Sequence, residues 1–257
     1  MDLAYYFELW KPMMAAGENL PWWQEFYIYF YQAFIQADRW KQYLEGVGIT
    51  LVTTALALAI GIVLGVVVAM CRTAHDQQRL GHRNPVLGFV NLICKIYVTV
   101  IRGTPMMVQL LIMGMVIFKS SRNFTAVGAL TLGINSGAYV AEIIRGGLMS
   151  LDPGQMEAGR SLGMNYIDTM RFIVIPQAFK AILPALGNEF IILLKDTSLI
   201  TVIGGKELLY AAQGIMNRTY EQMFPLFGIA IIYLVMVLIF SGIQGRLERR
   251  LRQSDRR

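Results

Sequence analysis

The longest uncharged stretches of the chain are too apolar for a domain that folds in water. Residues 46–71 and residues 222–245 hold no charged side chain over 26 and 24 positions. About 20 predominantly apolar residues are enough to cross the hydrocarbon core of a bilayer as a helix. Only 16% of the residues are charged and mean hydropathy is +0.48, whereas a soluble domain carries roughly a quarter charged residues. We therefore expect an integral membrane protein, not a soluble enzyme, a nucleic-acid binder or a disordered chain.

One further segment has the length of a span, and a second is too short to cross the membrane alone. Residues 123–141 are uncharged, and their apolar pattern continues to about residue 151. Residues 103–118 are short for a span, so we expect them to join residues 86–101 in one helix. Thr104–Pro105 should break or kink the joined helix, because proline donates no backbone hydrogen bond and restricts the residue before it.

A fifth segment, residues 181–203, has the length of a span but carries ionisable side chains. They are Glu189, Lys195 and Asp196. We count it as a span with buried polar residues. The sequence thus predicts an all-α, polytopic membrane protein with five transmembrane helices.

Lysine and arginine predict the orientation of these spans. Two alternating sets of connecting segments hold 13 and 7 of these cations. The richer set comprises residues 72–85, 145–180 and 246–257. Cytoplasmic loops are the ones enriched in Lys and Arg. We therefore expect a multi-pass membrane protein with its N-terminus outside and its C-terminus in the cytoplasm.

Residues 1–42 contain a dense aromatic stretch. Its members are Trp22, Trp23, Phe26, Tyr27, Tyr29, Phe30, Tyr31 and Phe34. Aromatic side chains favour the boundary between membrane and water. We expect an interfacial amphipathic helix on the outer face, and packing against the protein's own spans is the alternative. Residues 43–250 then form one transmembrane domain, followed by a basic cytoplasmic tail at residues 251–257.

Polar side chains recur at helical spacing inside the predicted spans. In the third span they form one stripe that only Ala138 interrupts: Thr131, Asn135, Glu142 and Arg145, with Tyr139 beside it. In the fourth span, Lys195, Asp196, Thr197 and Ser198 follow one another. Ionisable residues at membrane depth are costly and face a partner or a cavity. Together these residues could hold both ends of a zwitterion, or they could form an ion-pair network without a ligand.

Two pairs of glycines have the spacing of closely packed membrane helices. They are Gly61 with Gly65 and Gly133 with Gly137, and each fits the small-xxx-small pattern. The pattern is weak, because glycine is common in membrane spans.

Cysteines and histidines give no sign of a metal or catalytic site. Cys71 and Cys94 provide neither a disulfide framework nor metal-ligand spacing. His75 and His82 lie seven residues apart in a basic segment, where solvation at the headgroup level is favoured over a metal pair. We expect no catalytic residue and no metal.

The most specific motif lies on the predicted cytoplasmic side. Glu157-Ala158-Gly159 is followed by Gly163 and then by Ile173-Val174-Ile175-Pro176. We expect a short amphipathic helix from Pro153 to about Asn165, with a turn at Gly163 and a second helix that reaches Pro176. The small residues would let another backbone approach closely, and Glu157 would present a carboxylate to a basic partner.

This segment, residues 152–176, resembles the EAA loop of ABC-importer permeases, EAA-xxx-G-x9-I-x-LP. Gly159 replaces the third alanine and Ile175 replaces the leucine. The similarity extends over roughly residues 43–250 and is strongest to the polar amino acid uptake family (His/Glu/Gln/Arg/opine). Three further motifs carry it: Arg102-Gly103-Thr104-Pro105 with Gln109, Ile134-Asn135-Ser136-Gly137-Ala138-Tyr139 with Glu142, and Lys195-Asp196-Thr197-Ser198-Leu199.

The resemblance implies a type I importer permease in the bacterial cytoplasmic (inner) membrane. Two permease subunits would enclose a pathway for a polar or charged amino acid, which an extracytoplasmic binding protein delivers. Two cytoplasmic ATPase subunits, a homodimer, would receive the EAA helices. This chain has no GxxxxGK[ST] motif, so it is not expected to be an enzyme or to hold a cofactor; ATP and Mg²⁺ would lie on the ATPase. A second copy of this permease is favoured over a different one.

The resemblance also assigns roles to individual residues. Ligand contact falls to Asn135, Tyr139, Glu142, Lys195, Asp196 and Ser198. Coupling to the ATPase falls to Glu157, Ala158, Gly159 and Gly163, whereas Arg102, Thr104, Pro105 and Gln109 would shape the kinked second span. Glu142 or Asp196 could pair with the ammonium of the ligand, and Lys195 with its carboxylate.

Two other functions compete with the importer. A channel also places ions at membrane depth, but it does not need a cytoplasmic docking helix of small residues. A membrane-embedded enzyme would need a catalytic set, and the sequence contains no HExxH motif and no Cys/His nucleophile pair. Partners of the importer would be the ATPase, a permease copy, the binding protein, an amino acid and membrane lipid, without nucleic acid.

Overall fold

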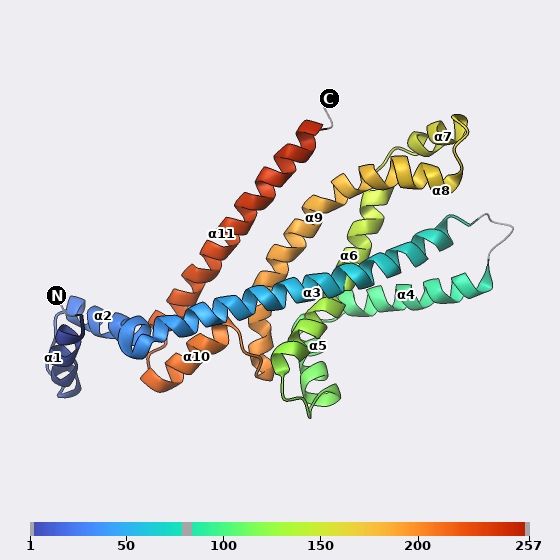
Figure 1. Cartoon of the computed structure of the whole chain (residues 1–257). Helices are drawn as coiled ribbons and strands as arrows, with labels where there is room; N and C mark the ends of the chain where they lie inside the picture. The colour runs from blue at the N-terminus through green and yellow to red at the C-terminus, as the bar shows by residue number, and fades with distance from the viewer. Residues whose placement is uncertain (1–2, 79–83, 255–257) are drawn as a thin grey trace.

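The computed structural model describes residues 3–78 and 84–254, and every regular element within them is a helix (Figure 1). By length and composition, five helical stretches in this part of the chain are able to cross a membrane. They are Trp22–Asp76, Pro85–Gly103, Phe124–Met149, Tyr166–Ile203 and Met223–Leu251. The predicted number of spans is confirmed.

The first span is the longest and extends at both ends beyond the apolar run. It comprises α2 (Trp22–Phe30), a π-helical turn (Tyr31–Ile35), a 3₁₀ turn (Gln36–Asp38) and α3 (Arg39–Asp76). Ala37 and Asp38 adopt positive φ angles of 54° and 56°, which bend the chain before α3. Arg72 and His75 therefore lie in α3, not in a loop, whereas His82 lies outside the described residues.

Two pairs of glycines let α3 pack directly on α6 (Phe124–Met149). A Cβ atom on Gly61 would lie 2.8 Å from Ser136 Oγ, and one on Gly65 would lie 2.5 Å from Val140 Cγ1. From the other side, Gly133 and Gly137 face side chains of α3 at 2.7 and 2.9 Å. The predicted close approach at these four glycines is confirmed.

The second span breaks at the predicted proline. Asn84 caps α4 (Pro85–Gly103), which ends where Thr104 becomes extended, with φ −114° and ψ 143°. After Pro105 the chain continues as α5 (Met106–Leu111) and a π-helical segment (Ile112–Ile117). Proline disfavours helical geometry at the residue before it, and the kink at Thr104–Pro105 is confirmed.

The expected boundary at Pro176 is wrong. The structure has α7 (Gly154–Ser161), a turn at Gly163 with φ +83°, and then one helical stretch from Tyr166 to Ile203. This stretch contains α8 (Tyr166–Thr169), a π-helical turn (Met170–Val174), α9 (Ile175–Asp196) and a 3₁₀ segment (Thr197–Ile203). Pro176 lies inside this stretch without ending it, because it directly follows the π-helical turn, and such local changes of helix geometry accommodate the missing N–H of a proline within a span.

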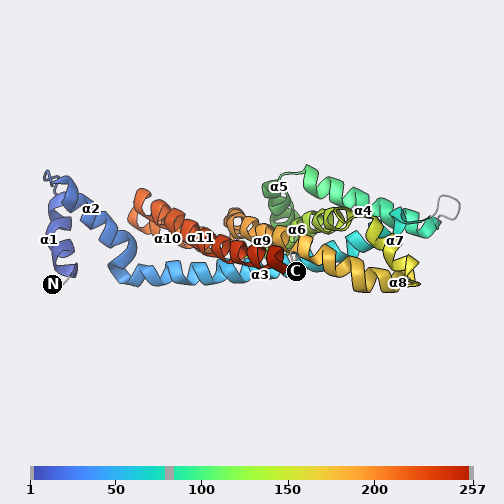
Figure 2. The same cartoon turned by 90° about the horizontal axis from the view of Figure 1, so that it is seen from above.

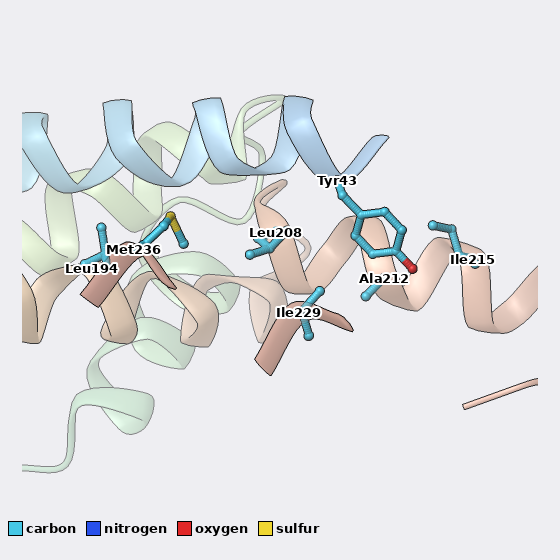
Figure 3. Packing of buried hydrophobic residues seen from close by; sticks show 7 residues of the cluster. All are labelled: Tyr43, Leu194, Leu208, Ala212, Ile215, Ile229 and Met236. Atoms are coloured by element: carbon cyan, nitrogen blue, oxygen red, sulfur yellow. The ribbon is translucent and has the colours of Figure 1, made fainter. Parts of the chain in front are cut away.

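Residues 204–221 connect the fourth and fifth spans, and they contain the helix α10 (Leu208–Thr219), which the sequence analysis did not predict. Its N-cap residue Glu207 is 1% exposed, and its carboxylate accepts hydrogen bonds from Tyr210 N (2.8 Å), Thr201 Oγ1 (2.6 Å) and Tyr233 Oη (2.6 Å). Figure 3 shows the apolar cluster below this cap, where side chains of α3, α9, α10 and α11 (Met223–Ser254) meet. It contains Tyr43, Leu194, Leu208, Ala212, Ile215, Ile229 and Met236. α11 continues to Ser254, so the predicted tail at residue 251 starts as helix.

The aromatic segment forms two helices instead of one, α1 (Leu3–Ala15) and α2. Its rings contact one another, as where Trp10 meets Trp23 at 5.2 Å between centroids, and Phe26 reaches Phe224 of α11 at 5.0 Å. Trp22 is nevertheless 78% exposed. Figure 2 shows α1 and α2 at the end of the molecule opposite to α7 and α8. The segment packs on the protein's own helices and also presents aromatic side chains outward.

The glycine contacts predict how α3 and α6 respond to a methyl group. In Gly65→Ala, the new Cβ would meet Val140 and the backbone nitrogen of Ala141, so the helices must move apart. We expect a loss of about 1–3 kcal/mol of stability, measured as a lower apparent melting temperature in detergent. Gly88→Ala on α4 is the control, since nothing lies within 4 Å of its Cβ position. Equal melting temperatures for the two variants would contradict the packing account.

Candidate functional site

The predicted pathway-shaping residues form a hydrogen-bonded chain across the kink of the second span. Gln109 on α5 donates from Nε2 to Ile101 O (2.8 Å) and to Thr104 Oγ1 (2.8 Å), so its amide bridges the break in the backbone. Its Oε1 accepts a hydrogen bond from Asn135 Nδ2 on α6 (3.0 Å). Buried backbone groups freed by a break need such partners in a membrane. The kink is therefore tied to the predicted polar stripe of α6.

Glu142 lies about two helical turns beyond Asn135 on α6, beside three arginines. Arg72 of α3 donates to its Oε1, Arg145 Nη2 lies 3.0 Å from its Oε2, and Arg102 Nη1 lies 3.8 Å from the same oxygen. The Arg102 guanidinium also lies 5.3 Å from the centre of the Tyr139 ring. The cluster carries an excess of positive charge, and the Nε of Arg145 is buried without a hydrogen-bond partner.

Sequence reasoning missed Arg72 as a partner of Glu142. Arg72 directly follows the long apolar run, where a cation ordinarily marks the end of a span. It is separated from Glu142 by 70 residues along the chain. The structure shows why: α3 continues for about one helical turn beyond the apolar run, to Asp76. This extension places Arg72 next to the third span.

Lys195 and Asp196 lie at the end of α9, where the α-helix changes to a 3₁₀ segment. Thr197 Oγ1 and Ser198 Oγ donate to the carbonyl oxygens of Leu194 and Lys195, each at 2.7 Å, which secures this transition. Lys195 is exposed and Asp196 is half-buried. Neither side chain has a hydrogen bond or salt bridge to another described residue, so both charges remain available to a ligand.

Glu189 has a different environment from Asp196, although both lie on α9. Glu189 is only 5% exposed, and its carboxylate accepts a hydrogen bond from Ser136 Oγ of α6 at 2.7 Å. This bond joins the third and fourth spans. Glu189 thus has a structural partner, which the sequence did not reveal.

The predicted ligand residues fall into two groups. Asn135, Tyr139 and Glu142 share the face of α6 that meets α4 and α5, whereas Lys195, Asp196 and Ser198 lie on the fourth span. Across the residues that the structure describes, no hydrogen bond or salt bridge connects one group to the other. The two spans that carry them are in contact through Ser136 and Glu189.

α7 carries the predicted coupling residues at one end of the molecule (Figure 1). Glu157 and Ala158 are exposed, whereas Gly159 is buried. A Cβ atom on Gly159 would lie 2.6 Å from Thr169 Cγ2 and 3.0 Å from Ile173 Cδ1. The small size of Gly159 thus serves packing within this chain. Gly163 supplies the left-handed turn that reverses the chain after α7.

Comparison with known proteins identifies the family of this membrane domain. The model of the family "Binding-protein-dependent transport system inner membrane component" matches residues 84–253. The arginine transport system permease protein ArtQ of Bacillus subtilis (strain 168) is 37% identical over 217 residues, which cover 82% of this chain and 93% of ArtQ. The glutamine transport system permease protein GlnP of Escherichia coli (strain K12) is 37% identical over 214 residues, or 81% of this chain and 92% of GlnP.

Solved structures agree with these relatives. An amino acid ABC transporter crystallised with histidines matches with a TM-score of 0.73 and 42% identity, covering 82% of this chain and 94% of that chain. The inward-facing MetNI methionine ABC transporter shares the fold, with a TM-score of 0.70 and 17% identity over 84% of this chain and 99% of that chain. From its helices, its motifs and these matches together, this chain belongs to the family of binding-protein-dependent transport system inner membrane components.

Proposed function

We propose that this chain is the membrane permease of an ATP-driven importer for a polar or charged amino acid. The observation that carries the proposal is the 37% identity to permeases named for arginine and for glutamine transport, over more than nine-tenths of their length. The unpaired charges of Lys195 and Asp196 in the fourth span support a zwitterionic substrate, because ionisable groups in spans serve a partner or a pathway.

The proposed substrate contacts are Asn135, Tyr139, Glu142, Lys195, Asp196 and Ser198. Asp196 receives the ammonium of the ligand and Lys195 its carboxylate, since neither side chain makes a hydrogen bond or salt bridge within the described residues. Glu142 already pairs with Arg72, Arg102 and Arg145, so besides contacting the ligand it holds these guanidinium groups in position beside the pathway. Tyr139, which is 38% exposed, offers an aromatic face and a hydroxyl.

The proposed coupling element is α7, which docks on a cytoplasmic ATPase homodimer. Glu157 and Ala158 are its exposed residues, and Gly159 and Gly163 fix how α7 folds back on the fourth span. ATP and Mg²⁺ bind the ATPase, and this chain performs no hydrolysis. Because α7 leads into one continuous helical stretch from Tyr166 to Ile203, movement at the dock reaches Asp196 through a single element.

The proposed assembly contains two copies of this permease and an extracytoplasmic amino acid binding protein. The N-terminus lies outside and the C-terminus in the cytoplasm, as the distribution of Lys and Arg predicts. Residues 1–42 lie at the interface between lipid and water on the outer face of this membrane. The exposed rings of Trp22 and Phe26 support this position.

The substrate site predicts the effect of Asp196→Asn. Loss of the carboxylate removes a charged hydrogen bond to the ammonium of the ligand, worth about 2 kcal/mol, or roughly a thirtyfold rise in half-saturation. Uptake should be measured in proteoliposomes with the ATPase and the binding protein added, using radiolabelled arginine or glutamine. An unchanged half-saturation would remove Asp196 from the substrate site, and ion conductance without ATP would favour a channel.

Glu142→Gln should behave differently, because it leaves three arginines without their carboxylate. We expect a loss of about 1–3 kcal/mol in stability, seen as a lower apparent melting temperature of the detergent-purified protein. Asp196→Asn, with no partner to lose, should keep the melting temperature of the unmodified protein. If Glu142→Gln melts normally and fails only in uptake, Glu142 contacts the ligand directly.

The coupling role predicts that Glu157→Lys separates the permease from its ATPase. The change reverses an exposed charge, so the fold should persist while ATP-driven uptake falls to background. Co-purification of the ATPase from native membranes measures the dock directly. Glu18→Lys is the matched control, since Glu18 is equally exposed but lies in the segment before α2. Normal uptake by a well-expressed Glu157→Lys variant would contradict the proposed dock.

A further inference from the structure

An apolar groove of about 640 Å³ lies between α3, α6 and α9, towards the end of the molecule that carries α7. Its lining includes Met70 and Ala74 of α3, Leu148 of α6, and Ala178 and Phe179 of α9. Met70 is 66% exposed and Phe179 is 56% exposed. The groove is therefore open at the surface of the spans and is not an enclosed packing void.

A second hollow of about 580 Å³ adjoins the groove. The two share the lining residues Thr73, Gln77, Leu148 and Met170. This hollow is also largely apolar, but it adds three exposed charged residues from α7 and the turn before it, Asp152, Glu157 and Arg160. An apolar slot along three spans thus leads into a site with one cation and two anions.

The apolar groove matches the acyl chain of a phospholipid, and the adjoining charged residues match its headgroup. We propose that the groove holds an acyl chain of a phospholipid with an ethanolamine headgroup, whose phosphate meets Arg160 and whose ammonium meets Asp152. Asp152 Oδ1 accepts the backbone N–H of Gly154 at 2.8 Å, and no other described residue donates to this carboxylate. A charged hydrogen bond from the ammonium completes it.

The charges of the hollow select this headgroup over the common alternatives. An anionic headgroup such as glycerol phosphate would bring its charge to a site with two carboxylates and one guanidinium. A choline headgroup has no N–H to donate to Asp152. Ethanolamine supplies both the phosphate for Arg160 and an N–H donor for the carboxylate.

Retention of lipid by the purified permease tests the groove. The protein, solubilised with its partner subunits, is incubated with equal amounts of phosphatidylethanolamine, phosphatidylglycerol and phosphatidylcholine, and bound lipid is measured by native mass spectrometry. Ala74→Trp fills the groove from an exposed position and should lower retention about tenfold, the effect of losing roughly two buried methylenes. Ala59→Trp, also exposed on α3 but outside the groove, should retain lipid normally.

Asp152→Asn tests the headgroup, because asparagine still accepts the N–H of Gly154 while its charge is gone. We expect the variant to lose the preference for phosphatidylethanolamine over phosphatidylcholine and to keep its fold. Equal retention of phosphatidylglycerol and phosphatidylethanolamine by the unmodified protein would overturn the headgroup assignment. Equal retention by Ala74→Trp and Ala59→Trp, or a change of permease stoichiometry in Ala74→Trp alone, would overturn the groove as a lipid site.

Discussion

The close approach of α3 and α6 fixes the positions of the other helices that carry candidate site residues. In lipid, helices gain little from the hydrophobic effect between them, so small residues and tight van der Waals packing hold them together. Gly61 is an example of how far this packing reaches. It leaves room for Ser136 on α6, and Ser136 in turn bonds to the buried carboxylate of Glu189 on α9. One missing side chain on the first span therefore permits a hydrogen bond between the third and the fourth.

The number of spans and the kink at Pro105 follow from local chemistry, and both could be predicted from the sequence. Pro176 was misjudged because the π-helical turn Met170–Val174 lets the helix continue through this proline, and the sequence alone does not show that turn. α10 was missed for a related reason. Its stability comes from the cap at Glu207 and from the apolar cluster around Leu208 and Ala212. The residues that pack on Leu208 and Ala212 come from α3, α9 and α11, which are separate helices of the chain.

For the candidate site, too, the sequence predicted which residues are polar, whereas only the structure shows their partners. Composition and spacing marked Asn135, Glu142 and Asp196 as polar residues at membrane depth, but not their surroundings. Glu142 has arginine partners on α3, α4 and α6, whereas Asp196 has none within the described residues. The free-energy cost of placing a charge in the membrane does not by itself distinguish a charge that stabilises the fold from one that binds a ligand. The three-dimensional positions of the arginines make that distinction.

The continuous helical stretch from Tyr166 to Ile203 has a mechanical consequence. Its 38 residues follow a path roughly 55–60 Å long, which bends along α9 (Figure 1). The ends are therefore closer together than this length, and a rotation of about 5° around one end would displace the other by at most about 5 Å. Gln244 of α11 donates to the Pro184 carbonyl oxygen at 3.1 Å, which ties this stretch to the fifth span. In the proposed function, a small rotation near α7 would therefore move both α9 and α11 in the interior of the membrane.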